Sequence, residues 1–281
     1  MVVQQHGRRV RGAAAAVAVA GIVTGVAGCG GGAEAGDRNA DPTQAVHRAA
    51  DRLVREGSSE ATTSMEMASG GTRVTIRGAG VYDYRAGKGR LKVRLPQDAA
   101  GAEEHRPITE LLAPGALYMK NRGAGVPADK WVRVDTASLD DGNLVTGGAT
   151  DPLAAAELLR GARDVTYVGD IDVAGVPTRH YRGRVDLAAA AAAASAGTRA
   201  TLAAAAKGFS KEPVTFEVYL DEGGLIRKVR HRFTFDGERH GGRGRKNAVV
   251  SSTTLLHDFG TKASVRLPAR GDIFSGEVAE K

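Results

Sequence analysis

Hydrophobic and polar residues alternate with a period of two along most of this chain, and this pattern predicts an antiparallel β-sheet. In the segment 90–95, Leu91, Val93 and Leu95 alternate with basic residues. A strand of this kind buries one face and exposes the other to solvent, as strands of antiparallel sheets do. Gly70-Gly71 separates two such segments and is typical of a two-residue hairpin turn. Along the whole chain the pattern predicts about ten strands, joined mainly by hairpin-sized turns.

Three segments have helical spacing instead. Asp41-Pro42 and Asp151-Pro152 each predict an N-cap followed by proline in the first turn, and the two helices are expected to end at Gly57 and Gly161. The segment 187–207 contains long alanine runs with one Ser-Ala-Gly break, so we expect either one kinked helix or two short ones. No βα unit repeats, so the fold class is α+β, with a long curved antiparallel sheet and helices on one side.

The first 28 residues have the composition of an export signal. A basic start, which includes Arg8, Arg9 and Arg11, precedes a short apolar core and then a run of small residues. The stretch from Gly12 to Gly28 is short for a membrane span, which needs about 20 apolar residues. An N-terminal membrane helix and an ordinary secretory signal remain the alternatives to the interpretation that follows.

The single cysteine, Cys29, directly follows this signal. The sequence Val26-Ala27-Gly28-Cys29 resembles a bacterial lipobox, with valine at a position where leucine is more common. This resemblance implies cleavage before Cys29 and a diacylglycerol group on its thiol. We therefore expect lipidation at Cys29 and an exported protein, anchored by lipid on the outer face of the cell membrane.

Three parts of the chain are expected: a lipoprotein signal peptide at 1–28, a flexible tether at 29–40, and one lipid-binding domain at 41–281. Removing 28 residues from 281 leaves 253 residues, with 36 basic and 32 acidic side chains and a net charge of +4. Such an excess suits anionic lipid headgroups but does not indicate nucleic-acid binding, for which aromatic interleaving is also missing. With Cys29 acylated, no cysteine remains for a disulfide or for thiol catalysis.

Motifs that carry catalysis or metal binding are missing from the sequence. It contains neither a Gly-x-Ser-x-Gly elbow nor a phosphate-binding loop of the Gly-x4-Gly-Lys type. The histidines lack the spacing of metal ligands. Asp140-Asp141-Gly142-Asn143 resembles part of a calcium loop but lacks the regular acidic spacing and the terminal glutamate, so we expect a polar turn. We predict no enzyme activity, no metal and no cofactor.

Several motifs resemble the LppX/LprAFG-type lipoproteins of actinobacteria, and together they cover residues 41 to 260. In the first motif, a predicted helix from Asp151 to Arg160 leads to Asp164-Val-Thr-Tyr-Val-Gly169. In the second, the turn Val173-Ala-Gly-Val176 is followed by Thr178 to Tyr181 and by Val185-Asp-Leu187. The other two are the strand pair Leu117-Tyr-Met-Lys120 with Lys130-Trp-Val-Arg-Val-Asp135 and the strand-turn-strand segment from Val218 to Lys228. These are patterns of fold more than of chemistry.

This resemblance implies a LolA/LolB-like half-barrel, in which a curved antiparallel sheet packs over a few helices with an apolar cavity between them. It also implies that the protein binds, and carries through the envelope, acylated lipid or lipoglycan. The expected lining of the cavity is apolar and comes from helices and strands: Val46, Leu53, Val74, Ile76, Val93, Trp131, Leu153, Leu158, Leu159 and Leu202. Plain core packing is the alternative for these residues, and the alanine-rich segment leaves the size of the cavity open.

A glycine-rich basic loop offers a second kind of contact. Arg243, Arg245 and Lys246 are expected to contact anionic headgroups of the membrane, and a solvated hairpin loop is the alternative. Further expected partners are an envelope transporter or a partner lipoprotein. The alternative function is an envelope sensor or scaffold that uses the same fold to bind a partner protein.

Overall fold

The computed structural model describes residues 41–69, 72–96, 106–123, 125–145, 150–209, 213–235 and 248–276. The signal, the tether, Cys29 and the basic loop with Arg243, Arg245 and Lys246 lie outside these residues, so the predictions about them stay predictions. Within the described ranges, no helix has both the length and the apolar character needed to cross a membrane.

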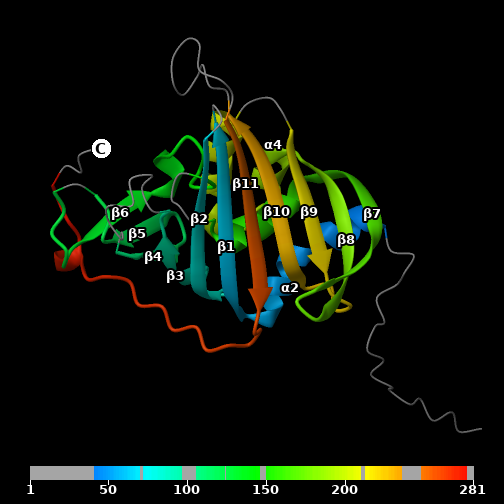
Figure 1. The fold of residues 1–281 in the computed structure, drawn as a ribbon, viewed down its shortest axis with the longest axis horizontal. Coiled ribbons are helices and arrows are strands. Elements are labelled where there is room, and N and C mark those ends of the chain that lie inside the picture. Colours follow the sequence, from blue (N-terminus) through cyan, green and yellow to red (C-terminus); the bar gives the residue numbers. More distant parts are fainter. Residues whose placement is uncertain are drawn as a thin grey trace, which may run out of the picture. The chain divides into compact units, whose positions relative to one another are not determined.

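Eleven strands form one antiparallel sheet with the order β6-β5-β4-β3-β2-β1-β11-β10-β9-β8-β7 (Figure 1). Strands β6 and β7 are its two outermost strands and do not pair with each other, so the sheet is curved but not closed into a barrel. The strands are β1 (Ser58–Ser69), β2 (Thr72–Asp83), β3 (Lys88–Arg94), β4 (Ile108–Ala113), β5 (Ala116–Lys120), β6 (Trp131–Asp135), β7 (Ala162–Val173), β8 (Val176–Val185), β9 (Val214–Leu220), β10 (Ile226–Phe235) and β11 (Ala248–His257). The predicted α+β class with about ten antiparallel strands is confirmed.

The helices are short, and the two predicted aspartate caps are present. Asp41 Oδ1 accepts a hydrogen bond of 2.9 Å from the backbone N–H of Thr43, and Asp151 Oδ1 accepts one of 2.8 Å from that of Leu153. The helices are α1 (Pro42–His47), α2 (Ala49–Glu56), α3 (Pro152–Leu158), α4 (Leu187–Ala193) and α5 (Ala196–Gly208), with 3-10 turns η1 (Thr136–Ser138), η2 (Leu159–Gly161) and η3 (Arg270–Asp272).

The alanine-rich segment, for which one kinked helix and two short helices were the alternatives, forms α4 and α5. Helix α4 ends at Ala193, the next residue Ala194 has extended backbone, and α5 begins after Ser195, so the segment forms two short helices. The first predicted helix is also divided, because Arg48 ends α1 and α2 begins at the next residue; α2 then ends at Gly57 as expected.

The core lies between the helices and one face of the sheet, which we call the inner face. Figure 1 shows the helices on this side, and α1 contacts β7 while α2 and α3 contact β10. In β3, Leu91 and Val93 point inward and are fully buried, whereas the basic residues between them are exposed. The largest fully buried side chains are Tyr82, Phe233, Leu53, Met65, Leu91, Leu112, Leu117, Leu144, Leu158, Leu159, Leu202 and Leu220.

A buried carboxylate joins the helices to one another. Glu157 on α3 is fully buried and accepts hydrogen bonds of 2.7 Å from Arg160 Nε and 3.0 Å from the backbone N–H of Ser195. Arg160 also donates to Asp51 on α2 at 2.6 Å. Because a buried charge is costly unless it is paired, this network holds α2, α3 and the start of α5 in a fixed relation.

Candidate functional site

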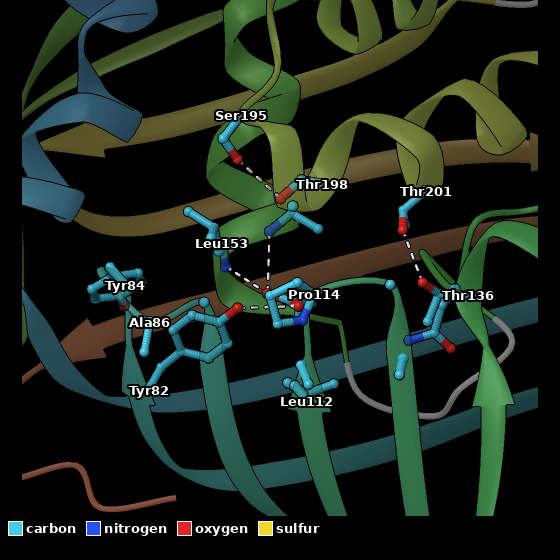
Figure 2. A pocket seen from close by; sticks show the side chains of 18 of the residues that line it. Tyr82, Tyr84, Ala86, Leu112, Pro114, Thr136, Leu153, Ser195, Thr198 and Thr201 are labelled. Atoms are coloured by element: carbon cyan, nitrogen blue, oxygen red, sulfur yellow. Dashed lines mark hydrogen bonds between the residues drawn. The ribbon is translucent and has the colours of Figure 1, made fainter.

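A cavity of about 280 Å³ opens where two hairpin turns of the sheet meet helices α3 and α5 (Figure 2). The turn between β2 and β3 contributes Ala86 and Gly87, and the turn between β4 and β5 contributes Pro114 and Gly115. The remaining lining comes from strands, helices and the segment around η1: Val54, Tyr82, Tyr84, Arg85, Leu112, Ala113, Ala116, Thr136, Gly142, Asn143, Asp151, Leu153, Ala154, Ser195, Gly197, Thr198 and Thr201. We call this cavity the helix–turn pocket.

Two tyrosines form one wall of the helix–turn pocket: Tyr82 at the end of β2, and Tyr84 in the turn that follows it. The rings of Tyr82 and Tyr84 lie 5.1 Å apart, and both side chains are buried. A Cβ atom at Gly89 would lie 2.4 Å from the Tyr82 ring, so any larger residue at this position would displace the ring. The Tyr82 hydroxyl donates to Asp151 Oδ2 at 3.2 Å, and the Tyr84 hydroxyl pairs with Ser59 Oγ at 2.7 Å.

Burial sets the protonation of this wall. It raises the pKa of Asp151 above the ordinary range, although hydrogen bonds from the N–H of Ala154, the hydroxyl of Tyr82 and the N–H of Leu153 oppose the shift. Burial, followed by the nearby Asp151 carboxylate, raises the pKa of Tyr82 well above its usual value. Tyr82 is therefore a hydrogen-bond donor at neutral pH, and the Asp151 carboxylate serves as an acceptor that caps α3.

The opposite wall of the pocket carries hydroxyl groups. Thr201 on α5 pairs with Thr136 on η1, with 2.8 Å between the two Oγ1 atoms, and Ser195 Oγ donates to Thr198 Oγ1 at 3.3 Å (Figure 2). Thr198 and Thr201 are three residues apart and lie on one face of α5. The pocket thus has apolar surface from the turns and α3, and hydroxyl groups along α5.

The segment that contains Gly142 and Asn143 packs closely against the backbone of α5 at one side of the pocket. Gly142 has a φ of 56°, and a Cβ atom there would lie 2.1 Å from the carbonyl oxygen of Thr201, so no other residue fits. The next residue, Asn143, is buried, and its Oδ1 accepts no hydrogen bond from the described residues. A buried acceptor without a donor costs about 1–3 kcal/mol, so a ligand hydroxyl or N–H group that reached this oxygen would recover that free energy.

Asp141 explains the local sequence that resembles a calcium loop. Its two carboxylate oxygens accept 2.9 Å hydrogen bonds from the backbone N–H groups of Asn143 and Val145. The carboxylate therefore holds a turn, and the polar turn predicted from the sequence is confirmed.

Leu153 is the one expected cavity residue that lines the helix–turn pocket. Six others are fully buried in the core: Val46, Leu53, Val93, Leu158, Leu159 and Leu202. Val74, Ile76 and Trp131 are half-buried on β2 and β6. Trp131 forms a parallel bridge with Ile273, and Lys120 Nζ lies 5.5 Å from the centre of its ring. Contact of these residues with lipid stays a prediction.

The sequence contained signals for the residues that were missed. Small residues gather in the two hairpin turns at Ala86-Gly87 and Pro114-Gly115, and hydroxyl residues recur on α5 at Thr198 and Thr201. Each signal is weak alone, because small and hydroxyl residues are common in turns and on helix surfaces. Only their convergence in the fold identifies a pocket.

One group of possible metal ligands occurs among the described residues. Atoms of Glu60, His257 and Asp258 lie within 4.8 Å of one another, and Glu60 faces His257 across β1 and β11. His257 Nδ1 already pairs with Asp258 Oδ2 at 2.7 Å, and the group is largely exposed. It lies on the surface of the sheet and does not contribute to the helix–turn pocket.

Comparison with known proteins returned relatives in sequence and in structure. No protein-family model matches the chain. An uncharacterised 31.2 kDa protein of Streptomyces griseus, encoded between rplA and rplJ, is 28% identical over 169 residues. The match covers 55% of this chain and 52% of that protein, so the chain spans about half the length of its curated relative.

Three solved structures are similar to this one. The Mycobacterium tuberculosis lipoprotein LppX has a TM-score of 0.45 and 10% identity, over 80% of this chain and 98% of that chain. LprF of Mycobacterium bovis has a TM-score of 0.41 and 12% identity, over 81% and 97%. A LolA superfamily protein of Nitrosomonas europaea has a TM-score of 0.32 and 9% identity, over 77% and 94%.

Proposed function

We propose that this chain is an exported envelope lipoprotein that binds one acyl chain of a lipid or lipoglycan in the helix–turn pocket, without catalysis. The observation that carries the proposal is the pocket itself, which lies between a curved antiparallel sheet and short helices. Leu112, Pro114 and Leu153 supply its apolar surface. Ligand pockets in proteins are generally concave, mostly apolar and equipped with a few polar groups that fix orientation.

The volume of the pocket sets the size of the ligand part that it accepts. A cavity of about 280 Å³ corresponds to on the order of nine water molecules at about 30 Å³ each. A methylene group is slightly smaller than a water molecule, so the pocket holds an acyl segment of on the order of ten methylenes. Each buried methylene contributes about 0.8 kcal/mol, from which the cost of association must be subtracted.

Polar groups of the pocket are placed to hold the oxygen-rich end of such a lipid. Asn143 Oδ1 is a buried acceptor, and the hydroxyls of Thr198 and Ser195 lie along α5. A glycerol or sugar hydroxyl can donate to Asn143 and remove the cost of leaving that acceptor unpaired. The expected ligand is therefore an amphiphile that carries a hydrogen-bond donor next to its acyl chain.

The protonation states in the pocket favour binding over catalysis. Asp151 is occupied by the cap of α3 and by Tyr82, and the raised pKa of Tyr82 makes its hydroxyl a poor acid near neutral pH. Both groups thus have structural roles. Lipidation of Cys29 and membrane contact of Arg243, Arg245 and Lys246 belong to the same proposal and add the anchor and a headgroup contact.

Binding of saturated fatty acids of increasing length to the full chain tests the proposal. Affinity should rise by about 0.8 kcal/mol per methylene and level off near ten methylenes. The matched 1-monoglycerides should bind more tightly than methyl esters of the same length, because only they carry hydroxyl donors for Asn143. Affinity that does not depend on chain length would contradict acyl binding in this pocket.

A free sheet edge favours a second function, an envelope sensor or scaffold that binds a partner protein. Strand β7 is an edge strand, and Tyr167, Val168 and Ile171 on it are 45%, 47% and 51% exposed. Exposed edges of this kind accept an extended strand of a partner by backbone hydrogen bonding. An Ile171→Lys variant separates the two functions, because it should disrupt strand addition at β7 and leave the chain-length profile of fatty-acid binding unchanged.

A further inference from the structure

Four arginines gather on the outer face of the sheet, on the side away from the helices. Arg182 and Arg184 lie on β8, and Arg230 and Arg232 lie on β10; all four are exposed. Strand β9 runs between β8 and β10 (Figure 1). Because neighbouring strands lie about 4.8 Å apart, the two arginine pairs flank β9 at a distance of about 10 Å from each other.

The strand register places these arginines around two residues of β9. Arg184 and Arg232 are both paired with Thr215, one on each side. Arg182 and Arg230 are both paired with Glu217 in the same way. Alternation along β9 puts Thr215 and Glu217 on the same face, so a hydroxyl and a carboxylate lie between four guanidinium groups.

These residues line an open groove of about 500 Å³, which we call the arginine groove. Gly183 and Phe216 contribute backbone to its floor, because alternation along β8 and β9 directs their side-chain positions to the inner face, where a Cβ atom at Gly183 would lie 2.8 Å from the Phe216 ring. The groove is also lined by Asp164 and Thr166 from the edge strand β7. It lies on the opposite face of the sheet from the core and shares no lining residue with the helix–turn pocket.

The arginine groove carries more positive charge than its own carboxylates neutralise. Arg184 has a contact of 3.9 Å with Asp164, in which both side chains are more than 60% exposed, so it contributes little. Among the described residues, Arg182, Arg230 and Arg232 have no carboxylate oxygen within 4.0 Å. Because β9 separates the two arginine pairs and supplies one carboxylate, Glu217, between them, the groove keeps an excess of positive charge that an anion can neutralise.

We propose that the arginine groove binds a phosphate group above Thr215. Guanidinium groups donate two parallel hydrogen bonds to phosphate oxygens, and Arg184 and Arg232 are placed to do so from both sides. The Thr215 hydroxyl supplies a further donor, while Glu217 repels an anion and thereby selects the Thr215 end of the groove. This inference does not depend on the helix–turn pocket or on acyl binding.

Phosphate reaches such a site from two sources, a lipid headgroup or a soluble phosphate. One experiment tests both sources. The full chain, in micelles of a neutral detergent, is labelled with the arginine reagent phenylglyoxal. Mass spectrometry then maps the modified peptides. The probes are inorganic phosphate, glycerol 3-phosphate and micelles that contain phosphatidylglycerol. Arg90 and Arg94, exposed on the outer face of β3, serve as controls in the same molecule.

The arginines of the groove should be modified several-fold more slowly in the presence of phosphate, while Arg90 and Arg94 are unaffected. Protection by soluble and lipid phosphate alike identifies a general phosphate site, and protection by phosphatidylglycerol alone identifies a headgroup site; both support the proposal. Glu217→Gln should lower the phosphate concentration needed for protection, and Thr215→Val should raise it. Equal protection of Arg90 and Arg94, or no protection at the groove, would overturn the proposal.

Discussion

The Tyr82 hydroxyl donates a hydrogen bond of 3.2 Å to Asp151 Oδ2 and so connects strand β2 to the first turn of helix α3. The other oxygen of the same carboxylate accepts from the N–H groups of Leu153 and Ala154. One carboxylate therefore caps a helix and ties it to the sheet. Because Tyr82, Asp151, Leu153 and Ala154 all line the helix–turn pocket, this bond fixes two walls of the pocket relative to each other.

Tyr82→Phe removes the donor and leaves Asp151 with the cap bonds alone. We expect the free energy of unfolding to fall by about 1–3 kcal/mol, because a buried charged acceptor loses a partner. Urea unfolding measures this change. Tyr118→Phe, at a half-buried position of β5 outside the pocket, is the matched control and should change stability little. An equal loss in both variants would rule out a special role for the bond to Asp151.

His231 on β10 is buried against Phe233, and burial lowers its pKa to about 3. A histidine whose pKa is lowered in the folded state stabilises the fold fully above its ordinary pKa near 6.5. That stabilisation is lost as the pH falls from 6.5 towards 3, because in this range His231 is protonated in the unfolded chain but stays neutral in the folded chain. The loss over this window is on the order of 5 kcal/mol.

A His231→Phe variant should therefore have a flatter stability profile than the wild type between pH 6.5 and pH 3. Urea unfolding at several pH values, with the wild type and the variant compared at each, isolates this contribution from that of the carboxylates. Identical slopes for the two proteins would show that His231 has the same pKa in the folded and the unfolded chain, which would contradict the lowered pKa.

Arg160→Met should destabilise the fold by about 3–5 kcal/mol, because it leaves the buried carboxylate of Glu157 without its cation. The double variant with Glu157→Gln removes the charge but keeps an acceptor for the N–H of Ser195. We expect it to recover much of the lost stability in thermal or urea unfolding. If the double variant is less stable than Arg160→Met, the pair stabilises through packing and not through charge.

Leu153→Ala should enlarge the helix–turn pocket by the volume of about three carbon atoms, at a cost of about 2–5 kcal/mol in stability. The chain length at which fatty-acid affinity levels off should then increase by about three methylenes. Leu159→Ala, at a buried core position outside the pocket, loses the same atoms and should leave that chain length unchanged. The same shift in both variants would show that acyl chains bind elsewhere.

The arrangement of strands and helix ends was predictable because local chemistry determines it. Asp41 and Asp151 precede prolines and cap helices, and Leu91 and Val93 alternate with basic residues on a half-buried strand. The break at Arg48 was not predictable, since nothing in its neighbourhood disfavours a continuous helix. The backbone at Arg48 stays helical, with a φ of −78° and a ψ of −10°, so the division between α1 and α2 is slight.

The helix–turn pocket was only partly predictable, for a different reason. An apolar pattern identifies the buried face of a helix. It does not show whether the space in front of that face is filled by side chains or left open as a cavity. Leu158, Leu159 and Leu202 were therefore expected to line a cavity, and they pack into the core. The space that stays open is bounded by small residues such as Gly197 and Ala154, whose distant segments meet only in the folded chain.

Mass spectrometry of lipid retained by the purified full chain tests acyl binding in the helix–turn pocket most directly. Ala154→Leu fills the pocket, whereas Ala188→Leu adds the same group at an exposed position of α4. Urea unfolding confirms that both variants remain folded. We predict one non-covalently bound acyl lipid per chain in the wild type and in Ala188→Leu, and a strong loss of it in Ala154→Leu. A folded wild-type protein without lipid, or equal lipid in all three proteins, would contradict the account.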